Sequence, residues 1–141
     1  DALARPVHPA VVDLRLESDA WLLGAEGEVH SILANLVSNA VKYTPADGCI
    51  DVRWWVDADG GHVAVRDTGI GIAPEHLPRL TERFYRVDPG RSRKLGGSGL
   101  GLAIVKHALL RHGGRLEIAS RVGEGSVFTC HFPATRIQSR E

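Results

Sequence analysis

Asn35-Leu36-Val37-Ser38-Asn39-Ala40-Val41-Lys42-Tyr43 closes an apolar segment with helical periodicity and carries two asparagines four residues apart. Two glycine clusters follow it along the chain, Asp67-Thr68-Gly69-Ile70-Gly71 and Gly96-Gly97-Ser98-Gly99-Leu100-Gly101. These three segments supply an amide ligand for a metal ion, one acid for the edge of a base, and bare backbone for phosphates. Their order therefore predicts a pocket for Mg²⁺ and ATP.

The polar positions of the first segment share one side of the expected helix. They are spaced i, i+4, i+7 and i+8, which places them on one stripe, and they are Asn35, Asn39, Lys42 and Tyr43. Asn39 offers a neutral oxygen to Mg²⁺, an ion that completes its ligand set with phosphates and water. Lys42 can meet a phosphate as a point charge. The alternative is an amphipathic helix with solvated amides, in which two interior asparagines cost helix propensity without compensation.

Asp67 follows an expected strand and precedes two glycines. A carboxylate only accepts hydrogen bonds, and the exocyclic amine of adenine donates them. Gly69 and Gly71 leave room for a flat base against the backbone. Asp-Thr-Gly also fits a plain turn or the nucleophile turn of an aspartic protease. The protease reading needs a second such motif and a β-rich fold, which this helix-bearing pattern does not provide.

The third cluster, Gly96 to Gly101, opens directly into an expected helix, so backbone N–H groups and the positive helix end can face an anion. The spacing is not that of a P-loop, and the cluster does not follow a strand as in a dinucleotide-binding fold. Basic residues lie just upstream and could fold over ATP as a lid, although a solvated charge run explains them equally well. They are Arg86, Arg91, Arg93 and Lys94.

Composition favours one globular domain without bulk affinity for polyanions. The chain has 141 residues, of which 43% are hydrophobic and 24% charged, and its formal net charge is +0. Nucleic-acid or membrane-surface binding through overall charge is therefore disfavoured. No apolar run approaches the roughly 18 residues of a spanning helix, and no signal peptide is visible. Cys49 and Cys130 lack metal-type spacing and are expected to be buried strand thiols.

The rest of the sequence predicts strands with interleaved helices in one α/β domain over residues 1–141, with a core over about residues 11–133. A helix is expected from Glu26 to Tyr43, ended by Thr44-Pro45, and Asp57 to Gly61 is a hairpin-turn signal. Strands are expected at Val11 to Leu16, Ala20 to Leu23, Cys49 to Val56, His62 to Arg66, Arg115 to Ser120 and Ser126 to Phe132. One or two short helices are expected in Pro74 to Arg83, and another helix from Leu100 to Arg111. A mobile loop is expected over Arg86 to Ser98 and a frayed tail over residues 134–141.

Taken in order, these segments resemble the catalytic and ATP-binding domain of bacterial sensor histidine kinases. The resemblance covers the N, G1, F and G2 boxes of that family, which correspond to Asn35 to Tyr43, Asp67 to Gly71, Phe84 to Asp88 and Gly97 to Leu102. It runs from about Val11 to Pro133, nearly the whole chain. The stretch Leu80 to Asp88, together with Gly97 to His107, resembles the phosphate-sensing branch of the family.

The resemblance implies an α/β fold, a two-layer sandwich with a mixed sheet of about five strands packed on three helices, shared with gyrase- and Hsp90-type ATPases. It implies ATP and Mg²⁺ as cofactors, with Asn39 as the magnesium ligand. It also implies that Lys42 and Arg86 position the γ-phosphate, together with the backbone of the G2 box.

Adenine recognition by Asp67 is implied in the same way, with Tyr43, Ile72 and Leu102 as walls of the base pocket. Phe84 and Tyr85 are expected to couple the lid to the body and to a partner helix. The full set of implied nucleotide-binding positions is Asn35, Asn39, Lys42, Tyr43, Asp67, Gly69, Gly71, Ile72, Tyr85, Arg86, Lys94, Gly97, Ser98, Gly99, Leu100, Gly101 and Leu102.

One position separates a kinase from an ATPase in this resemblance. Hydrolysing relatives carry a glutamate four residues before the metal-binding asparagine, where it can activate water. Asn35 holds that position here, and an amide is a very poor general base. We therefore expect little ATP hydrolysis and transfer of the γ-phosphoryl group to a positioned acceptor.

The acceptor expected from the resemblance is a histidine followed by an acidic residue on a separate helical hairpin, and none of the seven histidines has that setting. His30, His107 and His112 are expected to be ordinary polar or packing residues. The chain is therefore expected to be the cytoplasmic piece of a longer, membrane-bound homodimer that carries a dimerisation hairpin and phosphorylates a response regulator. Ala25 stands where many members have Asp, so Glu26 or Gly24 is expected to cap the helix instead.

Two other functions remain open at this point. A gyrase- or Hsp90-like ATPase would have the same pocket, and Asn35 argues against it. A module that only docks partners would have lost catalysis, and intact Asn39, Asp67 and G2-box glycines argue against that loss.

Overall fold

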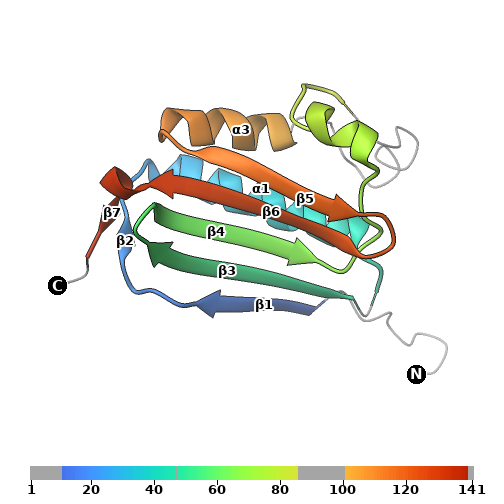
Figure 1. The fold of residues 1–141 in the computed structure, drawn as a ribbon, viewed down its shortest axis with the longest axis horizontal. Coiled ribbons are helices and arrows are strands. Elements are labelled where there is room, and N and C mark those ends of the chain that lie inside the picture. Colours follow the sequence, from blue (N-terminus) through green and yellow to red (C-terminus); the bar gives the residue numbers. More distant parts are fainter. Residues whose placement is uncertain (1–10, 47, 86–100, 140–141) are drawn as a thin grey trace.

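The computed structural model describes residues 11–46, 48–85 and 101–139 and shows a sheet covered on one face by helices (Figure 1). The five-stranded sheet has the order β1-β3-β4-β6-β5. β1 runs parallel to β3 and the other neighbours are antiparallel, so the sheet is mixed. Its strands are β1 (Val11–Leu16), β3 (Cys49–Asp57), β4 (Gly60–Asp67), β5 (Arg115–Arg121) and β6 (Gly125–Pro133).

Two α-helices of the described residues, α1 (Glu26–Tyr43) and α3 (Gly101–Arg111), form the second layer. The expected fold class is confirmed, and α1 has the predicted bounds. The helix expected between Pro74 and Arg83 is η1 (Pro74–Arg79), a 3-10 helix. Pro78 lies inside it and lacks the N–H that an α-helix would use there.

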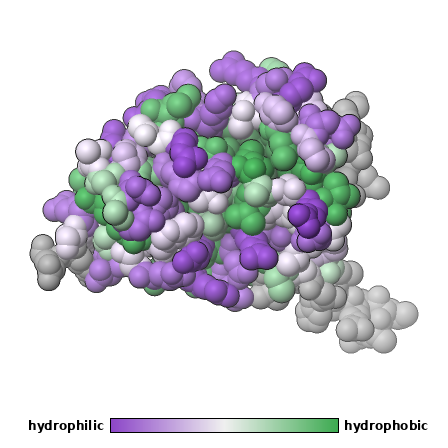
Figure 2. Space-filling model, in the orientation of Figure 1, coloured by the Kyte–Doolittle hydropathy of each residue, from purple (hydrophilic) through white to green (hydrophobic). Residues whose placement is uncertain are grey.

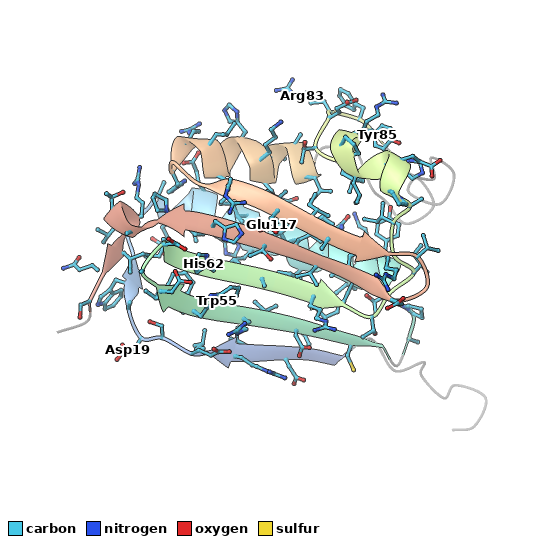
Figure 3. All side chains as sticks on the ribbon, viewed as in Figure 1. Asp19, Trp55, His62, Arg83, Tyr85 and Glu117 are labelled. Carbon is cyan, nitrogen blue, oxygen red and sulfur yellow. The ribbon has the colours of Figure 1, made fainter. Side chains whose placement is uncertain are left out.

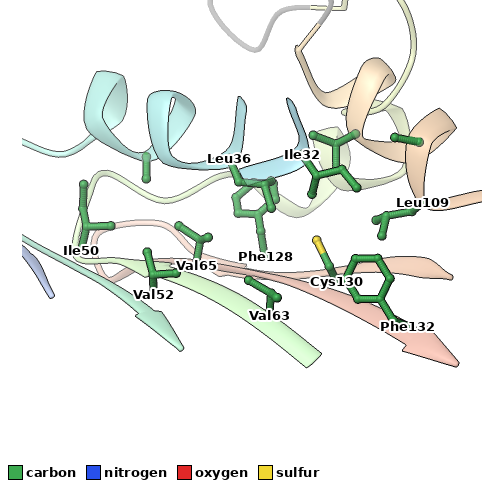
Figure 4. Close-up of a cluster of buried hydrophobic side chains, with 13 residues drawn as sticks. Ile32, Leu36, Ile50, Val52, Val63, Val65, Leu109, Phe128, Cys130 and Phe132 are labelled. Carbon is green, nitrogen blue, oxygen red and sulfur yellow. The ribbon is translucent and has the colours of Figure 1, made fainter. Parts of the chain in front are cut away.

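The core lies between α1, α3 and the sheet (Figure 4). α1 buries Ile32, Leu36 and Ala40, which are spaced by four residues and so lie on one side of the helix. Burial of a large apolar side chain contributes about 1.5–3 kcal/mol to stability. The sheet and α3 contribute Ile50, Val52, Val63, Val65, Val105, Ala108, Leu109, Phe128, Cys130 and Phe132.

Alternation along the strands gives the sheet a helix-facing side and a solvent-facing side. In β4, Val63, Val65 and Asp67 share the buried side, whereas His62 and Arg66 lie on the other. No α-helix of the described residues covers the solvent-facing side (Figure 1). In the view of Figure 2, hydrophilic residues are interspersed with smaller apolar areas.

The start of α1 is held by a residue from the end of α3. Ala25 is the N-cap and makes no side-chain cap hydrogen bond. Its backbone N–H donates to His112 Nε2 at 3.0 Å, and His112 Nδ1 donates to the Ala108 carbonyl at 2.8 Å. A Cβ atom on Gly24 would lie 2.7 Å from the His112 ring. Buried His112 therefore caps α1, in place of the Glu26 or Gly24 cap expected from the sequence, and is more than a packing residue.

The expectation of a frayed tail over residues 134–141 is wrong for its described part. η2 (Ala134–Arg136) leads into β7 (Ile137–Gln138), which pairs with β2 (Trp21–Leu22) in a separate two-stranded sheet. β2 lies within the strand expected at Ala20 to Leu23. β7 was not expected, because a two-residue strand is too short to produce an alternating pattern. The loop expected over Arg86 to Ser98 lies outside the described residues.

One of the two cysteines departs from the expectation that both are buried. Cys130 is buried in β6, and burial raises the pKa of its thiol to about 12, which makes it a poor nucleophile. Cys49 is exposed, because it is the first residue of β3 and lies where the sheet ends.

Candidate functional site

The polar stripe of α1 meets the start of α3 at Asn35. Asn35, Asn39, Lys42 and Tyr43 are all partly buried. Asn35 Nδ2 donates to the Ser31 carbonyl at 2.8 Å, so the amide is fixed within the helix. A Cβ atom on Gly101 would lie 3.0 Å from Asn35 Oδ1. The structure thus brings the N-box and the last G2-box glycine together.

Asp67 is the acid of the candidate site and lies at the end of β4, where it is only 6% exposed. The Gly69 backbone N–H donates to Asp67 Oδ1 at 2.8 Å. Burial raises the pKa of Asp67, and backbone hydrogen bonds from Gly69 and Ser126 partly oppose this shift. A carboxylate has about four acceptor positions, so Asp67 retains capacity for an additional donor.

The turn after Asp67 is fixed by close contacts with the protein's own backbone. A Cβ atom on Gly69 would lie 2.3 Å from the Tyr43 carbonyl oxygen. Gly71 has φ 75°, and a Cβ atom there would lie 2.1 Å from the Arg121 carbonyl oxygen. Both glycines are therefore required by backbone packing, a reason different from the room for a base that the sequence suggested.

α1 contacts Gly101, the described residue of the second glycine cluster, and the turn that holds the first cluster. Its middle lies against α3 through Asn35 and Gly101, and its last residue accepts a hydrogen bond from Ile70 N–H at 3.3 Å. Asn39 lies one helical turn after Asn35 and one turn before Tyr43. The polar stripe consequently extends from the start of α3 to the Asp67 turn, as a shared pocket requires.

The expected apolar walls lie next to these elements. Ile72 and Leu102 are partly buried and pack against the core cluster. Ile72 N–H donates to Ser120 Oγ at 2.8 Å, and Ser120 Oγ lies 2.7 Å from Ser126 Oγ. Ser126 is the cross-strand partner of Asp67. Ser120 and Ser126 therefore support the turn after Asp67. The sequence analysis did not select them, because only strand pairing places them beside that turn.

Thr44 is a second residue that sequence reasoning did not select. It follows the last residue of α1 and is 8% exposed. Its Oγ1 atom is buried and has no hydrogen-bond partner among the described residues. Buried hydroxyl groups are normally satisfied by protein, water or ligand. An unsatisfied hydroxyl beside the residue that contacts Gly69 fits a site that takes a polar ligand.

The expected lid residues are only partly described. Arg86, Lys94, Gly97, Ser98, Gly99 and Leu100 lie outside the described residues. Tyr85 is described and lies beside η1, where its hydroxyl group contacts His76 Nδ1 and Arg79 stacks on its ring at 4.5 Å (Figure 3). Phe84 is 67% exposed and has φ 64°, an uncommon conformation for a residue with a side chain.

The described residues contain no group of three or more His, Cys, Asp or Glu side chains that could hold a metal ion. No helix in the described ranges is long and apolar enough to cross a membrane.

A family model described as histidine kinase-, DNA gyrase B- and HSP90-like ATPase matches residues 24–136. The chain belongs to this family. It is 60% identical over 120 residues to the phosphate regulon sensor protein PhoR of Pseudomonas aeruginosa, a match that covers 85% of this chain and 27% of PhoR. The chain thus spans about a quarter of the length of this curated relative, and 30% of the PhoR of Haemophilus influenzae, with which it shares 40% identity.

Solved structures agree with this assignment. The mycobacterial sensor histidine kinase MprB superposes with a TM-score of 0.75 at 29% identity, covering 88% of this chain and 81% of MprB. Full-length ShkA in complex with AMPPNP superposes with a TM-score of 0.78 at 30% identity, covering 92% of this chain and 26% of ShkA. The resemblance to histidine kinases stated from the sequence boxes is confirmed.

Proposed function

We propose that this chain is the catalytic domain of a sensor histidine kinase, which binds Mg·ATP and donates its γ-phosphoryl group to a histidine on a separate dimerisation hairpin. The observation that carries the proposal is the buried Asp67 at the end of β4, tied through its turn to the polar stripe of α1. A buried acid with spare acceptor capacity suits the adenine amine, and the stripe leads from it toward the helix N-terminus of α3.

Each residue then has a defined task. Asp67 accepts a hydrogen bond from adenine, with Tyr43, Ile72 and Leu102 packing around the base. Asn39 would hold Mg²⁺, which neutralises charge on the phosphates. Lys42 and Arg86 would position the γ-phosphate, and Tyr85, Lys94 and the backbone of residues 97–101 would enclose the triphosphate.

In the transfer step, an acceptor imidazole nitrogen bonds to the γ-phosphorus while the bond from phosphorus to the bridging oxygen breaks and ADP leaves, and the second imidazole nitrogen then releases its proton to water. The protein contributes position and charge neutralisation rather than a general base. Asn35 supports this assignment, because an amide cannot deprotonate water and its Nδ2 already donates to Ser31. We accordingly expect phosphotransfer to dominate over hydrolysis, against a gyrase-like ATPase.

The identity to PhoR extends the proposal to the whole protein. Phosphate sensing is the proposed signal, a response regulator the proposed recipient, and a membrane-bound homodimer the proposed assembly. This chain would supply the nucleotide-binding, cytoplasmic part of that protein.

The test mixes this chain with a separately produced histidine-bearing hairpin of the Pseudomonas aeruginosa relative and γ-labelled ATP. We expect label on the hairpin, none on the hairpin without this chain, and little free phosphate. Rapid phosphate release without the hairpin would favour the ATPase instead. Nucleotide binding without transfer to any acceptor would favour a docking module.

A further inference from the structure

The solvent-facing side of the sheet carries a pair of histidines that the nucleotide site does not use. His62 of β4 and His131 of β6 are directly paired across the two strands. Their Nδ1 atoms lie 2.7 Å apart, and their rings meet edge to face with centroids 4.9 Å apart. Figure 3 shows His62 on the open face of the sheet, near Glu117 and Trp55.

A carboxylate holds the other nitrogen of each ring. His62 Nε2 lies 2.8 Å from Asp57 Oδ1, and His131 Nε2 lies 2.8 Å from Glu117 Oε1. A carboxylate only accepts hydrogen bonds, so both Nε2 atoms carry the hydrogen. Two neutral rings in that tautomer present bare Nδ1 lone pairs to each other, and only a cation between them makes the contact favourable.

The ligand atoms select the kind of cation, since two imidazole nitrogens face each other. We propose that His62 and His131 form a two-nitrogen binding site for a divalent transition-metal ion, with Zn²⁺ as the best match. Imidazole nitrogens suit zinc, copper and nickel, whereas Mg²⁺ prefers oxygen ligands and therefore does not compete.

The arrangement has the outer contacts of a metal site. Metal-binding histidines commonly donate their second ring N–H to a carboxylate, which fixes the tautomer and raises ligand basicity. Asp57 and Glu117 are placed for this role. Trp55 stacks on the His62 ring at 5.0 Å, and Arg115 Nη1 lies 3.6 Å from Glu117 Oε1, so both the ring and one carboxylate are held.

The two histidine rings must move slightly apart to accept the ion. Zinc–nitrogen bonds of about 2.0–2.1 Å at a tetrahedral angle separate the nitrogens by about 3.3 Å, so the two rings must part by roughly 0.6 Å. The His62 side chain is only 7% exposed and the His131 side chain 20%, so the shift would fall on His131. The described residues offer no third ligand, so water would fill the remaining positions and the ion would exchange readily.

The site is separate from the nucleotide pocket. His62 and Asp67 lie near opposite ends of β4, about 17 Å apart along the strand, and their side chains point to opposite faces of the sheet. Zinc binding can thus be measured without nucleotide and scored independently of the proposed kinase activity.

The experiment titrates ZnCl₂ into the nucleotide-free chain by calorimetry at neutral pH, in a Cys49→Ser background that removes the exposed thiol. We expect a one-to-one binding event that weakens at least about 10-fold in both His62→Gln and His131→Gln. Glu117→Gln should weaken it with both nitrogens still present. The matched control is His30→Gln, an exposed histidine of α1, which should bind zinc like the background protein.

Histidine ¹⁵N NMR supplies the second readout and reports folding of each variant. Zinc should shift the Nδ1 resonances of His62 and His131 and leave both Nε2–H signals in place. Zinc affinity in the His62→Gln and His131→Gln variants equal to that of the background protein would overturn the proposal. The absence of any zinc-dependent Nδ1 shift would also overturn it and leave the pair bridged by a proton alone.

Discussion

The backbone N–H of Ile70 donates to the carbonyl oxygen of Tyr43 at 3.3 Å, so the last residue of α1 is bonded to the turn that follows β4. This contact joins the helix that carries the proposed magnesium ligand to the turn that carries the proposed adenine acid. Two segments separated by more than twenty residues in the sequence thereby become one wall of the candidate pocket.

Replacement of Gly69 by Ala should loosen this junction. The new Cβ atom would lie 2.3 Å from the Tyr43 carbonyl oxygen, so the backbone must shift. We expect a loss of about 1–3 kcal/mol in the free energy of unfolding, measured by urea denaturation. Gly27→Ala is the control, because no atom lies within 4 Å of a Cβ there and alanine favours the helix. Equal stability of Gly69→Ala and wild type would contradict the close contact.

Asp67→Asn should separate stability from function. Burial raises the pKa of the native carboxyl group above its unfolded value, so its stabilising contribution is complete below the unfolded pKa of about 3.9. That contribution is lost as the pH rises through the raised native pKa. The asparagine side chain carries no charge, so the variant avoids the cost of burying a carboxylate at pH 7. Its melting temperature at pH 7 should equal or exceed that of wild type, while it binds ADP more weakly. The melting temperature of the variant minus that of wild type should be higher at pH 7 than at pH 4. A lower difference at pH 7 would contradict the direction of the pKa shift.

Asn39→Ala should reduce the magnesium dependence of nucleotide binding. The amide oxygen of Asn39 is the proposed protein ligand, so its loss removes most of the difference between ATP affinities measured with and without Mg²⁺. Calorimetry at several magnesium concentrations measures this difference. Ser38→Ala, an exposed neighbour on α1, serves as control. An unchanged magnesium titration in Asn39→Ala would count against the metal role.

His112→Leu should destabilise the fold without touching the site. The substitution removes hydrogen bonds to the Ala25 N–H and the Ala108 carbonyl, and it leaves both groups without this partner. We expect a cost of about 1–3 kcal/mol in the free energy of unfolding, measured in urea. His107→Leu, at an exposed position of α3, should change it by no more than about 0.5 kcal/mol. Similar effects of the two substitutions would argue against the capping role.

Strong local patterns made much of this fold predictable. The apolar period of α1, with Thr44-Pro45 after it, fixed its bounds, and the glycine-rich turn after Asp57 located the β3–β4 hairpin. β2 was expected as a strand, but β7 and its pairing with β2 were not predictable, because β7 is two residues long and meets β2 only through the tertiary fold. The exposure of Cys49 was likewise hidden, since a sequence pattern does not reveal where a sheet ends.

The candidate site likewise has some residues that could be predicted from the sequence and others that could not. Asp67 and the α1 stripe could be selected from residue type and spacing. Ser120, Ser126 and His112 could not, because each acts through a partner that only strand pairing or helix packing supplies. The close contact between Gly69 and the Tyr43 carbonyl oxygen was not predictable, because it depends on how the end of α1 packs on the turn after β4.

Calorimetric titration of Mg·ADP into this chain and into Asp67→Ala tests the central claim most directly. The account predicts one nucleotide per wild-type chain and an affinity at least about 10-fold lower in the variant, because the purine amine loses a buried charged acceptor. Wild-type affinity in Asp67→Ala, or no heat of binding in either protein, would contradict it.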